Sequence, residues 1–237
     1  MVTVADEPYP GVLRERLGSA APPVLFGSGP PELLTTGGVA IVGSREADAE
    51  ASSFTEGLAA AAARGGATVI SGGARGIDAV AMRAAFQAGG SVIGVVPEGV
   101  ERRLREASTR AAVAVGQAVL VSPYHPAAAF STGAAMGRNK LIYALADVAV
   151  VVSSAEGSGG TWAGALEAIE GRWVPILVRE APNAPPGNAA LIGRGATALP
   201  PADVGPSITV DELLLLAGPV DRVAEATSEY GQQRLFE

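Results

Sequence analysis

From position 39 onward, short runs of β-branched and apolar residues alternate with alanine-rich segments long enough to form helices. The runs predict strands at 39–43, 68–71, 92–96, 118–122, 148–152 and 175–178. The segments between them predict helices at about 47–64, 77–89, 101–116, 132–146 and 160–171. Repeated βα units with right-handed crossovers build parallel sheets, so the pattern predicts an α/β fold with a doubly wound, Rossmann-like sheet.

The two ends of the chain depart from this pattern. Residues 1–38 are rich in Pro and Gly with one short helical segment at 11–17, and we expect a leader that packs on the main domain, 39–200. After Arg179 the pattern dissolves, and the apolar run at 208–216 predicts a docking helix. Residues 201–237 are therefore expected to form a C-terminal helix and tail.

The amino-acid composition excludes several classes of protein. Hydrophobic residues make up 48% of the chain and aromatic residues only 5%, which suits an aliphatic core of helices packed on a parallel sheet. The absence of Cys excludes disulfides and thiolate catalysis. No apolar run approaches the ~20 residues of a membrane span and no signal peptide is evident, so we expect a cytoplasmic protein that does not enter membranes.

The charge balance argues against a protein that coats nucleic acid without specificity. The net charge is −7, and such coating depends on many phosphates neutralised by Lys and Arg. Lys140 is the only lysine, so nearly all positive charge is guanidinium. Guanidinium groups favour bidentate phosphate contacts, and a local basic pocket is compatible with this composition.

Two glycine-rich, arginine-bearing turns follow consecutive predicted strands. The first is Val-Ala-Ile-Val-Gly-Ser-Arg at 39–45, and the second is Ser-Gly-Gly-Ala-Arg-Gly-Ile-Asp at 71–78. The carboxyl ends of parallel strands meet at one crevice, and each turn is expected to open a helix near Ala47 or Ile77 whose first amides lack partners. With Arg45 and Arg75, these amides favour a phosphate group.

Two further polar segments are expected at the same crevice. Arg138, Asn139 and Lys140 are expected at the start of a helix and at the rim of the crevice, and Ser158 to Thr161 form a third turn. No metal-ligand spacing and no ATP-binding loop occurs, so we expect neither metal nor cofactor. The predicted phosphate- or DNA-binding residues are Gly43, Ser44, Arg45, Ser71, Gly72, Gly73, Ala74, Arg75, Gly76, Asp78, Arg138, Asn139, Lys140, Ser158, Gly159, Gly160 and Thr161.

The two turns and the later Arg-Asn-Lys segment resemble the DNA-processing protein A (DprA/Smf) family in order and spacing. The resemblance implies a Rossmann-like fold, a homodimer that binds single-stranded DNA, and assistance in loading a RecA-type recombinase during DNA uptake (natural transformation) or recombination. The chain departs from the family pattern at three points. Lys140 replaces an Arg, Ala135-Met136 stands where Phe-Pro is usual, and we expect no winged-helix domain.

The acidic composition also suits a second hypothesis, a protein that binds a nucleotide or nucleotide-derived ligand, either as a sensor or as a phosphoribohydrolase-like enzyme. The Gly-rich turn at 157–161 resembles the loop of cytokinin-activating phosphoribohydrolases, but Gly164 stands where those enzymes have Glu. Glu156, Glu167 and Glu170 are the candidate carboxylates for such chemistry.

The C-terminal tail carries a candidate docking motif. Gln232, Leu235 and Phe236 resemble the short peptides that bind the bacterial sliding clamp, with Leu and Phe as apolar anchors. The alternative is that the pair folds back on its own domain or on a second copy of the chain.

Overall fold

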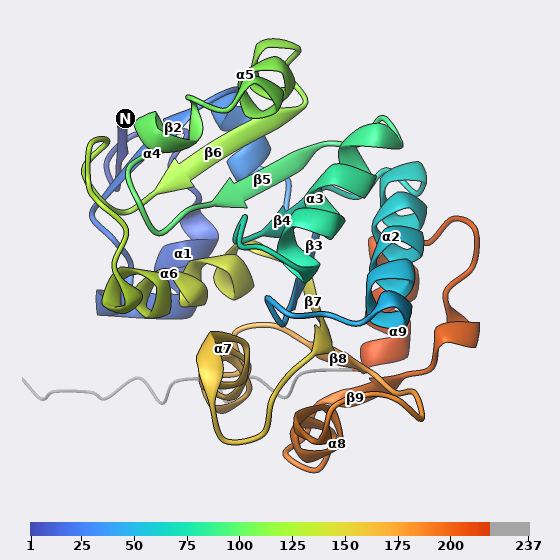
Figure 1. Cartoon of the computed structure of the whole chain (residues 1–237). Helices are drawn as coiled ribbons and strands as arrows, with labels where there is room; N and C mark the ends of the chain where they lie inside the picture. The colour runs from blue at the N-terminus through green and yellow to red at the C-terminus, as the bar shows by residue number, and fades with distance from the viewer. Residues whose placement is uncertain (219–237) are drawn as a thin grey trace, which may run out of the picture.

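The computed structural model describes residues 1–218. In this part of the chain, nine strands form a single sheet (Figure 1). The strands are β1 (Val2–Thr3), β2 (Val24–Ser28), β3 (Val39–Gly43), β4 (Val69–Ser71), β5 (Val92–Val95), β6 (Ala118–Ser122), β7 (Val148–Ser153), β8 (Ile176–Arg179) and β9 (Thr197–Leu199).

Helices connect these strands. They are α1 (Gly11–Leu17), α2 (Ala49–Arg64), α3 (Ile77–Gln87), α4 (Val100–Arg103), α5 (Ala107–Ala114), α6 (Thr132–Leu145), α7 (Gly159–Glu170), α8 (Pro186–Ile192) and α9 (Val210–Ala217), with 3-10 turns η1 (Gly18–Ala20), η2 (Pro31–Thr35) and η3 (Pro201–Asp203). None of the helices in residues 1–218 is both long and apolar enough to cross a bilayer.

The strand order is β1-β2-β6-β5-β4-β3-β7-β8-β9, and all neighbours from β6 to β9 pair in parallel. The chain runs outward from β3 to β6, then returns to the other side of β3 and continues outward through β7, β8 and β9. The order therefore reverses between β3 and β7. Open sheets of this kind bind ligands outside the carboxyl ends of the strands at that reversal. The doubly wound fold predicted from the sequence is confirmed.

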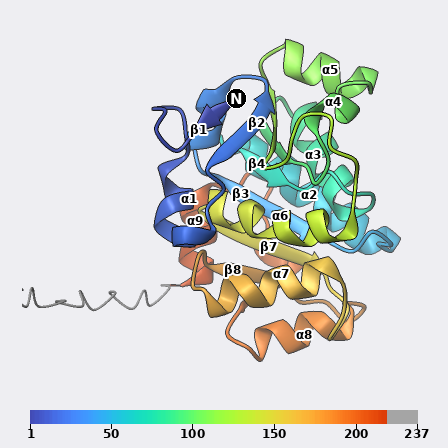
Figure 2. The same ribbon diagram turned by 90° about the vertical axis from the view of Figure 1, so that its left-hand side faces the viewer.

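Helices cover both faces of the sheet, so its strands are buried on both sides. Along β3, Val39 and Ile41 pack with α2 and α3, whereas Ala40 and Val42 pack in the cluster that contains α6 and α7. Figures 1 and 2 show α2, α3 and α9 on one side of the sheet and α1, α6 and α7 on the other. This double coverage explains why the central strands are continuous apolar runs rather than alternating ones.

The central elements match the sequence prediction closely, with one difference. The helix expected at 101–116 is two helices, α4 and α5, separated at Leu104 to Glu106. Arg110 Nη1 donates to the carbonyl oxygens of Leu104 and Arg105 at 2.9 and 2.7 Å. The guanidinium thus supplies partners for carbonyl groups that a continuous helix would have bonded internally.

Residues 1–38, the expected leader, contribute two strands to the sheet of the main domain. β1 pairs with β2, and β2 pairs with β6, in both cases antiparallel, so the segment extends the sheet beyond its parallel part. At Gly27, a Cβ would lie 2.8 Å from the carbonyl oxygen of Leu120. Gly27 is thus a glycine that lets β2 lie close against β6.

The chain after Arg179 is also more regular than expected, because it contains α8, β9 and η3 before α9. Asn188, which is buried in α8, accepts from the Ser154 N–H at 2.9 Å and donates to the carbonyls of Val152 and Arg179. The predicted docking helix is present as α9, which begins with a capping box between Thr209 and Glu212. The clamp-motif residues Gln232, Leu235 and Phe236 lie outside the described residues.

Candidate functional site

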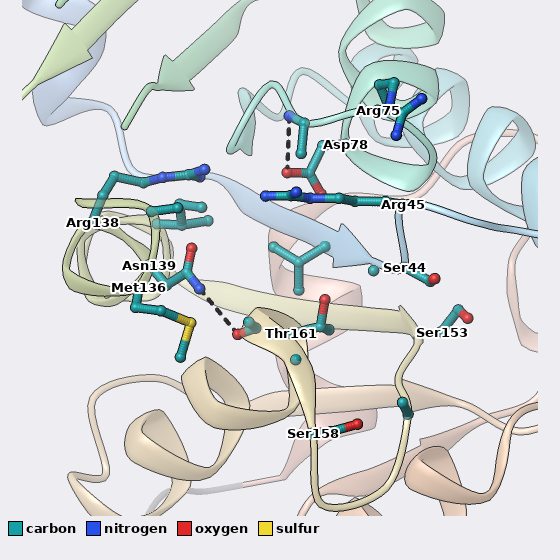
Figure 3. Close-up of a pocket in the computed structure, with 18 of the residues that line it drawn as sticks. Ser44, Arg45, Arg75, Asp78, Met136, Arg138, Asn139, Ser153, Ser158 and Thr161 are labelled. Atoms are coloured by element: carbon teal, nitrogen blue, oxygen red, sulfur yellow. Dashed lines mark hydrogen bonds between the residues drawn. The ribbon is translucent and has the colours of Figure 1, made fainter. Parts of the chain in front are cut away.

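A cavity of 790 Å³ opens at the carboxyl ends of β3 and β7, where the strand order reverses (Figure 3). Residues from β3, the loop before α3, α6 and the start of α7 form its walls. Of the residues predicted from the sequence, it brings together Gly43, Ser44, Arg45, Ala74, Arg75, Asp78, Arg138, Asn139, Ser158, Gly159, Gly160 and Thr161. The lining does not include Ser71, Gly72, Gly73, Gly76 and Lys140.

The first turn supplies side chains to the cavity rather than a helix terminus. The Ser44 N–H donates to the carbonyl of Ser153 at 2.9 Å, which joins this turn to the end of β7. We expected free amides on a helix that starts near Ala47. Instead, α2 begins at Ala49, its first residues do not line the cavity, and the Asp48 side chain caps it by accepting from the Ala51 N–H. Arg45 itself is exposed and extends into the cavity.

The second turn is tied to the first through the backbone. The Ile77 N–H donates to the Ser44 carbonyl at 3.2 Å, and Gly76 precedes it with a φ of 77°. A Cβ at Gly76 would also overlap Ser44 and Arg45, so only glycine fits here without strain. Ser71 has a structural role, since its hydroxyl donates to the carbonyl of Ile41 at 2.7 Å and is fully buried.

Asp78 and Arg138 bring opposite charges to the cavity from below its surface. Their exposed fractions are 6% and 3%. Burial raises the pKa of Asp78 to about 6, although the Arg138 guanidinium and backbone N–H groups of Ala74, Gly43 and Gly72 act in the opposite direction. Burial likewise lowers the pKa of Arg138, and the nearby Asp78 opposes that change. A Cβ at Gly72 would strike both side chains, which accounts for glycine at this position.

Arg138 and Asn139 lie in the middle of α6, not at its start as we expected. Figure 3 shows Arg138 and Arg45 extending toward one another from opposite sides of the cavity. Lys140 is not among the residues that line this cavity. Arg138 and Asn139 thus line the cavity together, and Lys140 does not.

The third turn presents the start of α7 to the cavity. Ser158 precedes this helix but makes no capping hydrogen bond, and the first turn of α7 carries no acidic residue. The amides of Gly159, Gly160 and Thr161 lack partners within the helix and carry partial positive charge. The Asn139 side chain donates to the Gly160 carbonyl at 3.0 Å and fixes this turn against α6.

The charge of the lining favours an anion. The lining contains three guanidinium groups, those of Arg45, Arg75 and Arg138, and two carboxylates, those of Glu46 and Asp78. Protonation of Asp78 would raise this excess of positive charge further.

The carboxylates proposed for phosphoribohydrolase chemistry lie elsewhere. Among the described residues that line the cavity, Glu156, Glu167 and Glu170 do not occur. At Gly164, where those enzymes have Glu, a Cβ would lie 3.1 Å from the Tyr143 ring and 3.3 Å from Asn139 Cβ. A larger side chain there would displace the wall of the cavity.

Sequence reasoning missed the apolar part of the lining, which includes Ala135, Met136, Ile142 and Tyr143 of α6. The periodicity of the helix would have predicted these apolar lining residues. If positions 138 and 139 face the crevice, positions 135 and 142 must share that face. Tyr143 is 2% exposed, and burial raises the pKa of its hydroxyl, which has no hydrogen-bond partner among residues 1–218.

The fold and the cavity define a doubly wound α/β protein with an arginine-lined crevice at the reversal of strand order. The family model for DNA recombination-mediator protein A matches residues 1–204. The chain belongs to this family, as the resemblance of its motifs indicated.

Known relatives agree with this assignment. A DprA protein of Mycobacterium tuberculosis is 33% identical over 160 residues, which cover 65% of this chain and 41% of that protein. The match therefore spans less than half of the relative's length. DNA processing protein A from Streptococcus pneumoniae superposes with a TM-score of 0.73 at 26% identity, covering 84% of this chain and 70% of that one.

A second solved structure concerns single-stranded DNA binding by DNA processing protein A from Helicobacter pylori. It superposes with a TM-score of 0.70 at 25% identity and covers 83% of this chain and 89% of that chain.

Proposed function

We propose that this protein binds single-stranded DNA in the crevice between β3 and β7 and acts in DNA processing. The observation that carries the proposal is the convergence of Arg45, Arg75 and Arg138 with the uncapped start of α7 in one cavity. Guanidinium groups and helix amides are the donors that proteins direct at phosphate oxygens. The H. pylori relative supports DNA as the source of those phosphates.

The proposal assigns two kinds of contact to the strand. Arg45, Arg75 and the amides of Gly160 and Thr161 hold backbone phosphates, which fixes the position of the strand without reading its sequence. The apolar wall formed by Met136 and Ile142 contacts sugars and bases. The fully ionised lining has only a small positive excess, so affinity depends on the directed contacts in the crevice rather than on diffuse attraction.

Family membership motivates a wider proposal about the role of this binding. We propose that the protein acts as a homodimer during DNA uptake or recombination and helps to load a RecA-type recombinase on the bound strand. A pull-down of purified RecA with and without single-stranded DNA tests the recombinase contact. A cytoplasmic location and docking of Gln232, Leu235 and Phe236 to the sliding clamp remain predictions from the sequence.

The binding proposal is tested by fluorescence anisotropy with a labelled oligonucleotide of about 15 nucleotides. Removal of one charge-assisted contact by Arg45→Ala is expected to weaken binding about 10- to 100-fold. Arg83→Ala is the matched control, because Arg83 is an exposed arginine that pairs with Glu56 at 2.8 Å and does not line the cavity. Its affinity is expected to equal that of the unchanged protein.

Competition separates the DNA proposal from the nucleotide-ligand alternative. Unlabelled single-stranded DNA should displace the probe, whereas double-stranded DNA and nucleoside monophosphates should displace it poorly. Efficient displacement by a nucleoside monophosphate, or absence of binding at low salt, would contradict the DNA proposal.

A further inference from the structure

A second, smaller cavity of 140 Å³ adjoins the main one on the side of α4. The two cavities share Arg45, Arg75 and Arg138, and the smaller one adds Arg103 and Phe130. Among the described residues that line it, four are arginines and none is a carboxylate. Its wall is therefore more positive than that of the main cavity, where Glu46 and Asp78 offset part of the charge.

The arginines of this smaller cavity differ in how far their donors are already used. Arg103 is engaged, since it donates to Glu98 at 2.6 Å and to the Gly73 carbonyl at 2.9 Å. Arg138 is not, because its buried Nε and Nη1 groups have no acceptor within residues 1–218. The guanidinium charge is itself buried, and an anion bound beside it would stabilise the charged form.

Phe130 provides an aromatic surface at the same place. It lies in the loop between β6 and α6 and is 45% exposed, and the Arg45 guanidinium lies 5.9 Å from its ring centroid. A ring held at this position by a cation–π contact, with the rest of its surface open, is suited to stack on an unpaired base. The sequence places no aromatic residue directly before Arg138, and Phe130 supplies one from the preceding loop.

The open surface continues beyond the ring. A third cavity of 260 Å³ shares Phe130 and Arg103 with the second and adds the exposed Arg102 on α4. Its lining also contains Glu98 and Glu106, both of which pair with Arg103, so Arg102 is the arginine there that no carboxylate of this lining engages in an ion pair within residues 1–218. The three cavities thus connect end to end through shared residues, with Phe130 at the second junction. They form one groove that leads from the start of α7 past Arg45 to α4.

We propose that a single strand of DNA follows this groove, with one phosphate between Arg45 and Arg138, an adjacent base stacked on Phe130, and the next phosphate near Arg102. This inference rests on the proposed function and deepens it by assigning a stacking subsite and an exit path. Stacking on Phe130 requires an unpaired base, so the subsite selects single strands over duplex. It also tolerates every base, because each has a π-face.

The test measures binding of three probes by the protein and by four single variants. The probes are a thymidine oligonucleotide of about 15 nucleotides, an abasic strand of the same length, and a thymidine oligonucleotide of about four nucleotides. Phe130→Leu keeps an apolar side chain but removes the ring, and Phe130→Trp restores an aromatic surface. Arg102→Ala removes the charge at the exit, with Arg83→Ala as its matched control.

Phe130→Leu should weaken binding of the long thymidine strand about fivefold or more and leave binding of the abasic strand nearly unchanged. Phe130→Trp should restore affinity. Arg102→Ala should weaken binding of the long strand but not of the short one, which fits within the main cavity. Circular dichroism of each variant checks folding. We expect the fold to persist, because the side chains of Phe130 and Arg102 are exposed.

Equal affinity of Phe130→Leu and the unchanged protein for the long thymidine strand would overturn the stacking subsite and leave the proposed function intact. An equal loss on the abasic strand would also overturn it, because the ring would then act without a base. Failure of the unchanged protein to bind any probe would instead contradict the proposed function itself.

Discussion

At the scale of single residues, the pairing of Asp78 with Arg138 links stability to the site. Both side chains are almost fully buried, and burial outweighs their mutual attraction in setting the pKa of each. Two charges are thus held out of water where the protein gains little stability from them. Arg138 lies in the wall of the crevice, beside the proposed path of the strand.

The raised pKa of Asp78 predicts a specific dependence of stability on pH. In the unfolded chain this carboxyl titrates near 3.8, whereas in the folded protein it titrates at about 6. The folded state therefore favours the protonated form, and its contribution to the free energy of unfolding is full below about pH 4 and is lost as pH rises through about 6. The loss is as much as about 3 kcal/mol.

Asp78→Asn removes this titration while it keeps the shape of the side chain. The difference in free energy of unfolding, unchanged protein minus variant, should fall as the pH rises from about 4 to about 6 in urea denaturation experiments. A difference that increases over this window would mean that Arg138 holds the carboxylate ionised, which is the opposite of the burial argument.

Residue-level prediction from sequence succeeded where the signal was local. Glycine and hydroxyl residues soon after strands indicate the turns at Gly43 to Arg45 and Ser158 to Thr161. The structure places both turns at the crevice. Phe130 was not predicted as a site residue, because only the folded structure brings it beside Arg45, a residue far away in the chain. Lys140, which was predicted with Arg138 and Asn139, is absent from the lining of the main cavity, and its role in binding stays a prediction.

At the scale of elements, apolar runs were sufficient to find the strands that are buried on both faces. β3 and β6 have the predicted bounds, and β4, β5, β7 and β8 differ by a residue or so at an end. The elements that were not predicted, β1, β2, α8 and β9, are short, and β2, α8 and β9 lie near Pro or Gly residues. Tertiary contacts fix them, such as the Asn188 hydrogen bonds that anchor α8, and local propensity does not report such contacts.

The C-terminal helix α9 offers a test of packing at this scale. Leu213 is fully buried against the sheet, and Leu215, two residues later, is 82% exposed. Leu213→Ala should lower the free energy of unfolding by about 2 to 5 kcal/mol, because it leaves a cavity in the core. Leu215→Ala should change it by less than about 0.5 kcal/mol in the same urea titration. Equal effects of the two substitutions would mean that α9 does not pack as described.

At the scale of the whole molecule, an acidic protein gathers arginines at one crevice. The net charge of −7 disfavours general attraction to nucleic acid, yet four arginines converge between β3, α4 and α6, and within residues 1–218 no carboxylate lines the cavity that they share. The fold makes this possible because the reversal of strand order opens a crevice where turns from separate parts of the chain meet. The proposed DNA binding therefore depends on positive charge at this crevice and not on positive charge over the whole surface.

The most direct test is the salt dependence of oligonucleotide binding by the unchanged protein, Arg45→Ala and Arg83→Ala. Each phosphate contact contributes about −0.7 to the slope of log affinity against log salt for single strands. We expect a clearly negative slope for the unchanged protein and for Arg83→Ala, and a slope shallower by about 0.7 for Arg45→Ala. Identical slopes for all three proteins, or binding insensitive to salt, would contradict the claim that arginines of the crevice hold the phosphates of the strand.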